Sequence, residues 1–213
     1  MSLDRTMLCV YVVTAAGLVP GRSHLDVALA AIGGGATAIQ LRAPELDDAA
    51  LELIAATLAR RCHEAGVLFV VNDRVEVAAR VGAGAHVGQM DEPGRAREVL
   101  GRTAVLGISV EGVPEALAGA SAGADYLGVT VWETSTKPSA RPQGLHGLRA
   151  VVQAVDLPVV AIGGIDEVNA REVLQAGAAG VAVVSAVAGA QDPVAAVRRL
   201  AEIVREARET EDG

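Results

Sequence analysis

The chain has 213 residues, and 51% of them are hydrophobic while only 2% are aromatic, so a large core must be built from small aliphatic side chains. This length fits one domain or two. The formal net charge of −8 argues against a nucleic-acid partner, since such a surface needs a basic stripe and stacking aromatic residues, and it means that an anionic ligand must be attracted by local positive charge.

The first apolar stretch, residues 7–19, superficially resembles the core of a signal peptide. Arg5 is balanced by Asp4, however, and β-branched residues are frequent in the stretch, so we expect a first strand instead. No apolar run reaches the roughly 18–20 residues of a membrane span. Cys9 and Cys62 fall in an expected strand and an expected helix, where reduced thiols are favoured over a disulfide. These features predict a cytoplasmic protein without a membrane partner.

Continuous apolar runs of strand type alternate along the chain with runs of helical periodicity. The strands are expected at residues 8–14, 36–42, 68–73, 85–89, 104–109, 125–129, 158–162 and 180–185. The helices are expected at residues 24–32, 51–66, 75–81, 93–100, 114–120, 145–155, 166–176 and 193–207. Asp166 is a suitable N-cap for the seventh helix, and the charged tail 208–213 is expected to fray.

The order of these elements predicts an α/β fold. Strands that read as unbroken apolar runs are buried on both faces, as parallel strands are. Ala-Gly-Ala recurs at residues 83–85, 122–124 and 176–178, each time closing a helix before a strand. We therefore predict a single-domain (β/α)8 TIM barrel with short loops over residues 1–207, with a doubly wound open sheet as the alternative. A dinucleotide fingerprint at Gly82, Gly84 and Gly88 is rejected, because these glycines precede a strand instead of opening a helix.

Polar residues collect at the C-terminal ends of the expected strands, where a TIM barrel carries its active site. Turn or cap chemistry explains any one of them, but not a series that recurs at strand after strand. The residues are Gln40 and Arg42, Asn72 and Asp73, Gln89 and Asp91, Ser109, Thr134, Thr136 and Lys137, Gly163 and Gly164, and Val184 and Ser185.

The residue types suggest a metal between two anion sites. Asp73 and Asp91, on adjacent strand ends, can share Mg²⁺ through their oxygens, although an ion pair between Asp73 and Arg74 is the structural alternative. Backbone N–H groups at Gly163-Gly164 and at Val184-Ser185 fit a phosphate site, and Arg42 and Lys137 would balance a second anion. This combination fits the joining of two phosphorylated fragments or the displacement of pyrophosphate.

The histidines point less clearly to function. His86 lies inside a strand, where a packed and hydrogen-bonded side chain is favoured over a catalytic one. His24, His63 and His146 show no partner pattern, and no protease-type metal motif or nucleophile signature is present.

Across nearly its whole length the chain resembles the thiamine phosphate synthase family. The motifs that carry the resemblance are Gln40-Leu41-Arg42, Val71-Asn72-Asp73, His86-Val87-Gly88-Gln89-Met90-Asp91, Gly107-Ile108-Ser109, Thr134-Ser135-Thr136-Lys137-Pro138, Gln143-Gly144-Leu145, Ala161-Ile162-Gly163-Gly164-Ile165 and Val183-Val184-Ser185-Ala186.

The resemblance implies a transferase that couples hydroxymethylpyrimidine diphosphate with thiazole phosphate and releases pyrophosphate. By matched position, it implies that Mg²⁺ is held by Asp73 and Asp91. It implies that the pyrimidine diphosphate is held by the Gln40-Leu41-Arg42 motif, Asn72, Ser109 and Lys137. It implies that the thiazole phosphate is held by Thr134, Ser135, Thr136, Gly164, Val184 and Ser185. Arg42, Ser109 and Lys137 would act on the reacting groups, the cations by stabilising the charge that grows on pyrophosphate.

Three positions depart from the family pattern. Pro44 stands where a lysine is usual, Thr14-Ala15 replaces a common Thr-Asp, and the segment around Val129-Thr130-Val131 is slightly shorter. Two alternatives therefore stay open: a thiazole tautomerase-like relative, or a degenerate barrel that binds thiamine precursors without turnover. The paired Asp73 and Asp91 favour the synthase, and we also allow for a homodimer.

Overall fold

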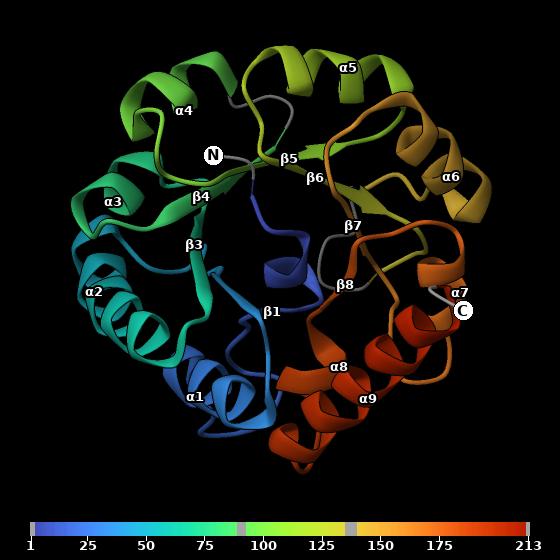
Figure 1. Cartoon of the computed structure of the whole chain (residues 1–213). Helices are drawn as coiled ribbons and strands as arrows, with labels where there is room; N and C mark the ends of the chain where they lie inside the picture. Colours follow the sequence, from blue (N-terminus) through green and yellow to red (C-terminus); the bar gives the residue numbers. More distant parts are fainter. Residues whose placement is uncertain (1–2, 89–92, 135–139, 212–213) are drawn as a thin grey trace.

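The protein is described from a computed structural model, and the structure describes residues 3–88, 93–134 and 140–211. Eight parallel strands form a closed barrel in chain order, with β8 pairing back to β1 (Figure 1). The strands are β1 (Val10–Val13), β2 (Ala38–Leu41), β3 (Leu68–Asn72), β4 (Gly84–Val87), β5 (Leu106–Val110), β6 (Tyr126–Thr130), β7 (Val159–Ile162) and β8 (Gly180–Val183). This closed sheet confirms the predicted (β/α)8 architecture and rules out the open sheet.

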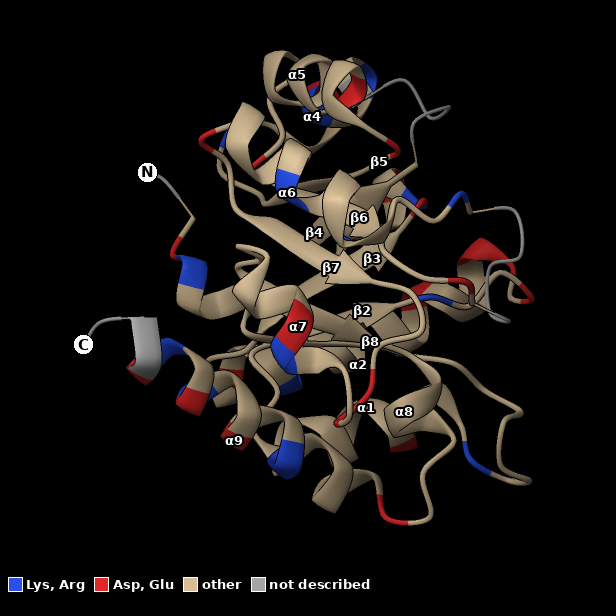
Figure 2. Cartoon of the chain, turned by 90° about the vertical axis from the view of Figure 1, so that its right-hand side faces the viewer, with Lys and Arg blue, Asp and Glu red and all other residues tan. Residues whose placement is uncertain are grey.

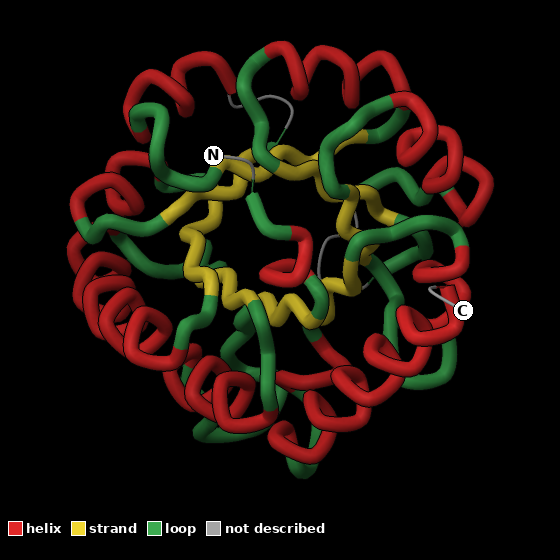
Figure 3. The backbone as a smooth tube through the Cα atoms, viewed as in Figure 1, coloured by secondary structure: helices red, strands yellow, loops and turns green. Residues whose placement is uncertain are grey.

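A ring of helices surrounds the barrel, as the tube drawing makes plain (Figure 3). They are α1 (His24–Gly34), α2 (Asp48–Ala65), α3 (Val75–Arg80), α4 (Pro93–Leu100), α5 (Val113–Ser121), α6 (Gly144–Ala154), α7 (Ala170–Gln175), α8 (Ser185–Ala188) and α9 (Pro193–Glu211). None of the helices in the described part of the chain is long and apolar enough to cross a membrane.

The strands separate two apolar cores because successive side chains point to opposite faces. In β1, Val10 and Val12 pack outward with the helices, while Tyr11 and Val13 pack inside the barrel. None of the eight strands contains Lys, Arg, Asp or Glu, and Figure 2 shows the charged residues on helices and loops around tan strands. The small side chains of the composition thus form the outer layer, and the two tyrosines of the chain, Tyr11 and Tyr126, fill the interior.

The N-terminal end of the barrel is closed by the chain itself. The short 3-10 helix η1 (Arg5–Leu8) lies inside the ring of strands in Figure 1, and its Leu8 is fully buried in the interior cluster. The apolar run was expected to be strand from Leu8, but the strand begins at Val10 because Leu8 ends this plug. A ligand must therefore enter the barrel from the opposite end, where the strands terminate.

Near the C-terminus the structure differs from the expected elements in three places. Asp166 is not the N-cap of α7: its Oδ1 accepts from the backbone N of Val168 at 2.9 Å, and this turn delays the helix, whose N-cap is Asn169. The four-residue helix α8 follows β8 at Ser185, within the expected strand. Helix α9 continues past the predicted end at Ala207 to Glu211.

Candidate active site

A pocket of about 1030 Å³, its open mouth included, lies at the C-terminal ends of the strands. The predicted site residues that line it come from β2, β3 and β5 and from the segments that follow β2, β3, β6, β7 and β8. They are Gln40, Arg42, Asn72, Asp73, Ser109, Thr134, Gly164, Val184 and Ser185. Leu41 is different, because its side chain is fully buried in the outer layer against the helices. Gln89, Asp91, Ser135, Thr136 and Lys137 lie outside the described residues, so the structure does not position them.

The backbone of Arg42 is held by a buried threonine at the end of β1. The Arg42 backbone N donates to Thr14 Oγ1 at 3.2 Å, and Thr14 Oγ1 also contacts His24 Nδ1 at 3.0 Å. His24 Nε2 lies 2.6 Å from Glu45 Oε1 in the loop after β2. Burial is the largest single influence and opposes ionisation of Glu45, but the hydrogen bond with His24, a backbone hydrogen bond and the nearby charges of His24 and Arg42 together lower its pKa. His24 thus has a partner set that sequence reasoning missed, because its partners lie far from it along the chain.

Asp73 projects from a strained turn at the end of β3. Its φ of +61° lies in the left-handed region, which is uncommon for residues other than glycine although aspartate tolerates it better than most. Asn72 Nδ2 donates to Asp73 Oδ2 at 2.6 Å, which fixes the carboxylate at the pocket wall. Arg74, the neighbour considered as a partner for Asp73, forms an ion pair with Asp48 at 2.6 Å.

The metal hypothesis can be tested against these oxygen donors. Mg²⁺ is usually held by one or two carboxylates together with substrate phosphates and water. Within residues 3–88, 93–134 and 140–211, no group of three His, Cys, Asp or Glu side chains could enclose a metal. The carboxylate of Asp73 suits a hard cation, so an open magnesium site shared with a substrate fits this wall, whereas an all-protein cage does not.

The floor of the pocket is a hydrogen-bonded row of side chains from five strands. Gln40 Nε2 donates to Tyr11 Oη at 2.9 Å, and Tyr11 Oη lies 2.7 Å from Tyr126 Oη. His86 bridges onward, with Nδ1 2.9 Å from Tyr126 Oη and Nε2 2.9 Å from Ser109 Oγ. Burial raises the pKa of both tyrosines well above the usual value, so their hydroxyls keep their protons.

This floor confirms one expectation and adds residues that the sequence did not reveal. His86 is packed and hydrogen-bonded as predicted, and it also lines the pocket. Tyr11 and Tyr126 were missed because each sits in an apolar run that reads as ordinary core. Their only sequence signal is that a chain nearly devoid of aromatic residues places both of its tyrosines inside strands.

Two glycines after β7 bring backbone to the opposite wall. Gly163 and Gly164 have φ of +92° and +65°, in the region that side chains disfavour. A Cβ at Gly164 would lie 3.0 Å from the carbonyl O of Glu133, and Asn169 Nδ2 donates to the Gly164 carbonyl at 2.8 Å. Backbone is therefore exposed at the rim here, beside Ser185, which is also exposed.

Arg22, which the sequence did not single out, ties this wall to the loop after β1. Its Nη1 donates to the carbonyl oxygens of Ala188 at 2.9 Å and Ala190 at 2.6 Å. These carbonyls end α8 and follow it, so Arg22 fixes the short helix that begins at Ser185. The Arg22 side chain therefore positions the backbone near the pocket and does not itself line the pocket.

Known proteins resemble this chain in sequence and in fold. A family model described as thiamine monophosphate synthase matches residues 10–187. A thiamine-phosphate synthase of Chloroflexus aurantiacus is 50% identical over 91% of each chain, and one of Moorella thermoacetica is 46% identical over 93% of this chain and 96% of its own.

Solved structures agree with the sequence comparison. Thiamine phosphate pyrophosphorylase from Pyrococcus furiosus has a TM-score of 0.88 at 42% identity, over 95% of this chain and 98% of that one. A 3-hexulose-6-phosphate synthase, at 19% identity and a TM-score of 0.68, shares the fold alone. The chain therefore belongs to the thiamine monophosphate synthase family.

Proposed function

We propose that this pocket joins hydroxymethylpyrimidine diphosphate to thiazole phosphate, forming thiamine monophosphate and releasing pyrophosphate. The transferase activity is that of the family. The assignment to this pocket rests on one observation: the predicted residues for the two substrates line the pocket from two different parts of the barrel. Gln40, Arg42 and Ser109 come from one side of the barrel, while Gly164 and Ser185 come from the segments after β7 and β8.

The pyrimidine diphosphate is assigned to the side that carries the cation. Arg42 lines the pocket and is half-buried, so its charge acts with less screening than at an open surface. As the bond between the pyrimidine methylene carbon and the diphosphate oxygen breaks, negative charge grows on pyrophosphate. A fixed guanidinium stabilises that charge without reorganising. Lys137, outside the described residues, is proposed as the second cation.

The second substrate is assigned to the glycine wall. A phosphate would approach the exposed backbone at Gly164, where a side chain would crowd the Glu133 carbonyl, and Val184 and Ser185 also line the pocket. Thr134, also in the lining, and the undescribed Ser135 and Thr136 would add hydroxyl donors. The phosphate would then hold the thiazole nitrogen facing the pyrimidine methylene carbon. The displacement is dissociative: pyrophosphate departs with the bonding electrons, and the nitrogen captures the resulting pyrimidine cation.

Magnesium is part of the proposal. Asp73 and the undescribed Asp91 would hold Mg²⁺, which supplies positive charge to the diphosphate oxygens when bound. The support is that Asn72 fixes the Asp73 carboxylate at the pocket wall beside Arg42.

The compartment of the protein and its binding partners are predicted from composition. The unpaired Cys9 and Cys62 support a reducing, cytoplasmic compartment. The net charge of −8 supports the absence of a nucleic-acid partner. A homodimer stays a prediction, and light scattering of the purified protein measures it.

The proposal is tested by mixing purified protein with both substrates and Mg²⁺. Thiamine monophosphate and pyrophosphate should form in equal amounts. Omission of the thiazole phosphate should abolish the formation of thiamine monophosphate. Tautomerisation of a thiazole substrate without pyrophosphate release would indicate the tautomerase alternative. Binding of both substrates by calorimetry without any product would indicate the degenerate barrel, and either result would overturn the proposal.

A further inference from the structure

The hydrogen bonds beneath the pocket form one continuous chain across the barrel. It runs from Gln40 on β2 through Tyr11, Tyr126 and His86 to Ser109 on β5, with each contact between 2.7 and 2.9 Å. Tyr11 and Tyr126 are almost completely buried. Because each hydroxyl has one proton to give, the direction of any bond in such a chain restricts the direction of the next.

The donor at the Gln40 end sets the direction of the whole chain. Tyr11 Oη accepts the Gln40 amide N–H, so its own proton points to Tyr126 Oη. Tyr126 then gives its proton to Nδ1 of His86, which leaves the imidazole proton on Nε2 and directs it to Ser109 Oγ. The reverse order would leave the buried Tyr11 proton facing the Gln40 amide N–H, and an unpaired buried donor is costly.

We infer that this chain of five residues couples the two ends of the pocket floor, so that Gln40 and Ser109 present a matched acceptor and donor to the ligand. With its N–H₂ group engaged by Tyr11, Gln40, which lines the pocket, has its carbonyl oxygen left to accept from the ligand. With its oxygen accepting from His86, Ser109 has its hydroxyl proton free to point into the pocket. Tyr11, Tyr126 and His86 act here as positioning residues.

The matched pair selects one class of heterocycle. A ring that carries an exocyclic amine and an unprotonated ring nitrogen offers the donor and acceptor that Gln40 and Ser109 lack. An oxo analogue reverses both roles, because its exocyclic oxygen accepts and its ring N–H donates. This consequence rests on the proposed function. It means that the pocket floor helps to select an aminopyrimidine diphosphate over its oxo analogue.

The coupling itself is tested in the ligand-free protein, by measuring which imidazole nitrogen of His86 carries the proton. Long-range ¹H–¹⁵N correlation spectra report the tautomer, and His86→Asn assigns the signals. The wild type should hold the proton on Nε2, with an excess of about tenfold or more over Nδ1, since the alternative leaves a buried donor unpaired. Gln40→Glu replaces the donor at the Gln40 end by an acceptor, so the order of the bonds should reverse and the proton should move to Nδ1. Tyr126→Phe removes the donor to Nδ1 and should bring the two tautomers to comparable populations.

Ile162→Val is the matched control, because Ile162 lines the same pocket and packs in the same interior cluster without taking part in the chain. It should leave the His86 tautomer unchanged. If Gln40→Glu does not fold, Tyr126→Phe tests the chain alone, since it removes the donor to Nδ1. A wild-type proton on Nδ1, equal wild-type populations, or a tautomer ratio insensitive to both Gln40→Glu and Tyr126→Phe would overturn the inference.

Ligand selectivity then separates this inference from the proposed function. Tyr11→Phe should lower the preference for the aminopyrimidine diphosphate over the oxo analogue by about tenfold, whereas Ile162→Val should not. If the His86 tautomer responds as expected but no pyrimidine diphosphate binds the wild type, the hydrogen-bond coupling is supported and the proposed function is wrong. If the aminopyrimidine diphosphate binds normally and the tautomer of His86 does not respond to Gln40→Glu or Tyr126→Phe, the coupling is wrong and the proposed function stands.

Discussion

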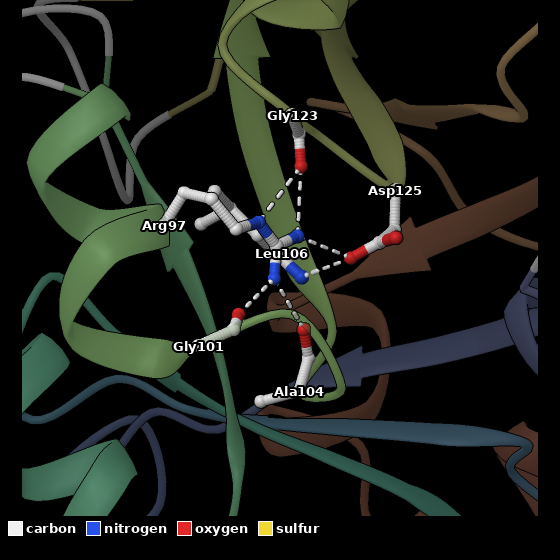
Figure 4. Close-up of polar contacts among 6 residues, drawn as sticks. All are labelled: Arg97, Gly101, Ala104, Leu106, Gly123 and Asp125. Carbon is white, nitrogen blue, oxygen red and sulfur yellow. Dashed lines mark hydrogen bonds and ion pairs between the residues drawn. The ribbon is translucent and has the colours of Figure 1, made fainter. Parts of the chain in front are cut away.

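Two arginines at opposite ends of the barrel show how the same side chain serves structure or function. At the N-terminal ends of β5 and β6, the Arg97 cluster comprises Arg97, Gly101, Ala104, Leu106, Gly123 and Asp125 (Figure 4). Arg97 donates to the carbonyl oxygens of Gly101, Ala104 and Gly123, and its Nη2 lies 2.6 Å from Asp125 Oδ2. Asp125 Oδ2 also accepts from the Leu106 backbone N at 2.8 Å.

Arg42 at the pocket end has the opposite environment. In the part of the chain that the structure describes, its guanidinium has no hydrogen bond or ion pair, and only its backbone N is tied down. Arg97 has its donors filled by neighbouring backbone and a carboxylate, so it cannot serve a ligand. Arg42 is positioned with its donors open, which is what an anion site requires.

The largest expected effect is at Asp73, if the pocket end requires Mg²⁺. Asp73→Asn should lower kcat by about 10³-fold, the upper end of the cost of losing one electrostatic contact. Asparagine tolerates a φ of +61° as aspartate does, so the midpoint of denaturant unfolding should not change. Wild-type turnover that survives an excess of EDTA would show that no metal is needed.

At the other end, Arg97→Met should act on stability and spare catalysis. It removes the guanidinium donor from three carbonyl groups and leaves the Asp125 carboxylate without its ion-pair partner, which should lower the free energy of unfolding by about 3 kcal/mol. Arg171→Ala is the control, because its pair with Glu206 is exposed and such pairs contribute about 0–1 kcal/mol. Urea titrations measure the free energy of unfolding of both variants. Equal losses of stability would mean that the Arg97 cluster contributes no more than an ordinary surface ion pair.

A third variant distinguishes crowding at the pocket from backbone strain. Gly164→Ala places a Cβ 3.0 Å from the Glu133 carbonyl at the proposed phosphate wall, and should weaken thiazole phosphate binding by about tenfold. Gly66→Ala has a similar φ, +68° against +65°, but its Cβ would meet nothing within 4 Å. Both should lose stability, and only the first should lose affinity in calorimetry. Unchanged affinity in Gly164→Ala would remove the thiazole phosphate from this wall.

The smallest effect is expected at Glu45, whose pKa is lowered against the larger single effect of burial by its hydrogen bonds, chiefly the one with His24, together with the nearby charges of His24 and Arg42. A carboxyl with a lowered folded-state pKa adds stability above its unfolded pKa, ordinarily 4.5, and loses it as the pH falls through the folded value. Glu45→Gln should therefore be slightly less stable than wild type at pH 7, and the two should converge in acid. The difference should be small because the Glu45 side chain is 53% exposed. A gap that persists below the folded pKa would assign the effect to packing.

The barrel could be predicted from the sequence because each strand is buried on both faces and reads as an unbroken apolar run. Helix ends were less certain. Asp166 has the chemistry of an N-cap, yet its side chain closes a turn before α7, and α8 is too short to show helical periodicity. Local propensity does not decide between such alternatives.

The lining of the candidate site was predictable for the same reason, since parallel strands bring their C-terminal ends to one face. Its supporting contacts were not. Thr14, His24 and Glu45 meet only after the chain has folded, and so do Tyr11 and Tyr126, which lie 115 positions apart. A hydroxyl inside an apolar run looks like core until its partner across the barrel is known.

The central claim is that the open arginine at the pocket end acts on the departing pyrophosphate. The most direct test measures kcat, KM and the free energy of unfolding on the same preparations of wild type and Arg42→Ala. We predict a fall in kcat of about 10²–10³-fold, larger than any rise in KM for the pyrimidine diphosphate, because the charge on the leaving group grows in the transition state. The free energy of unfolding should stay within about 0.5 kcal/mol of wild type. A kcat within about twofold of wild type, against the 10²–10³ typical of such a contact, would contradict the account.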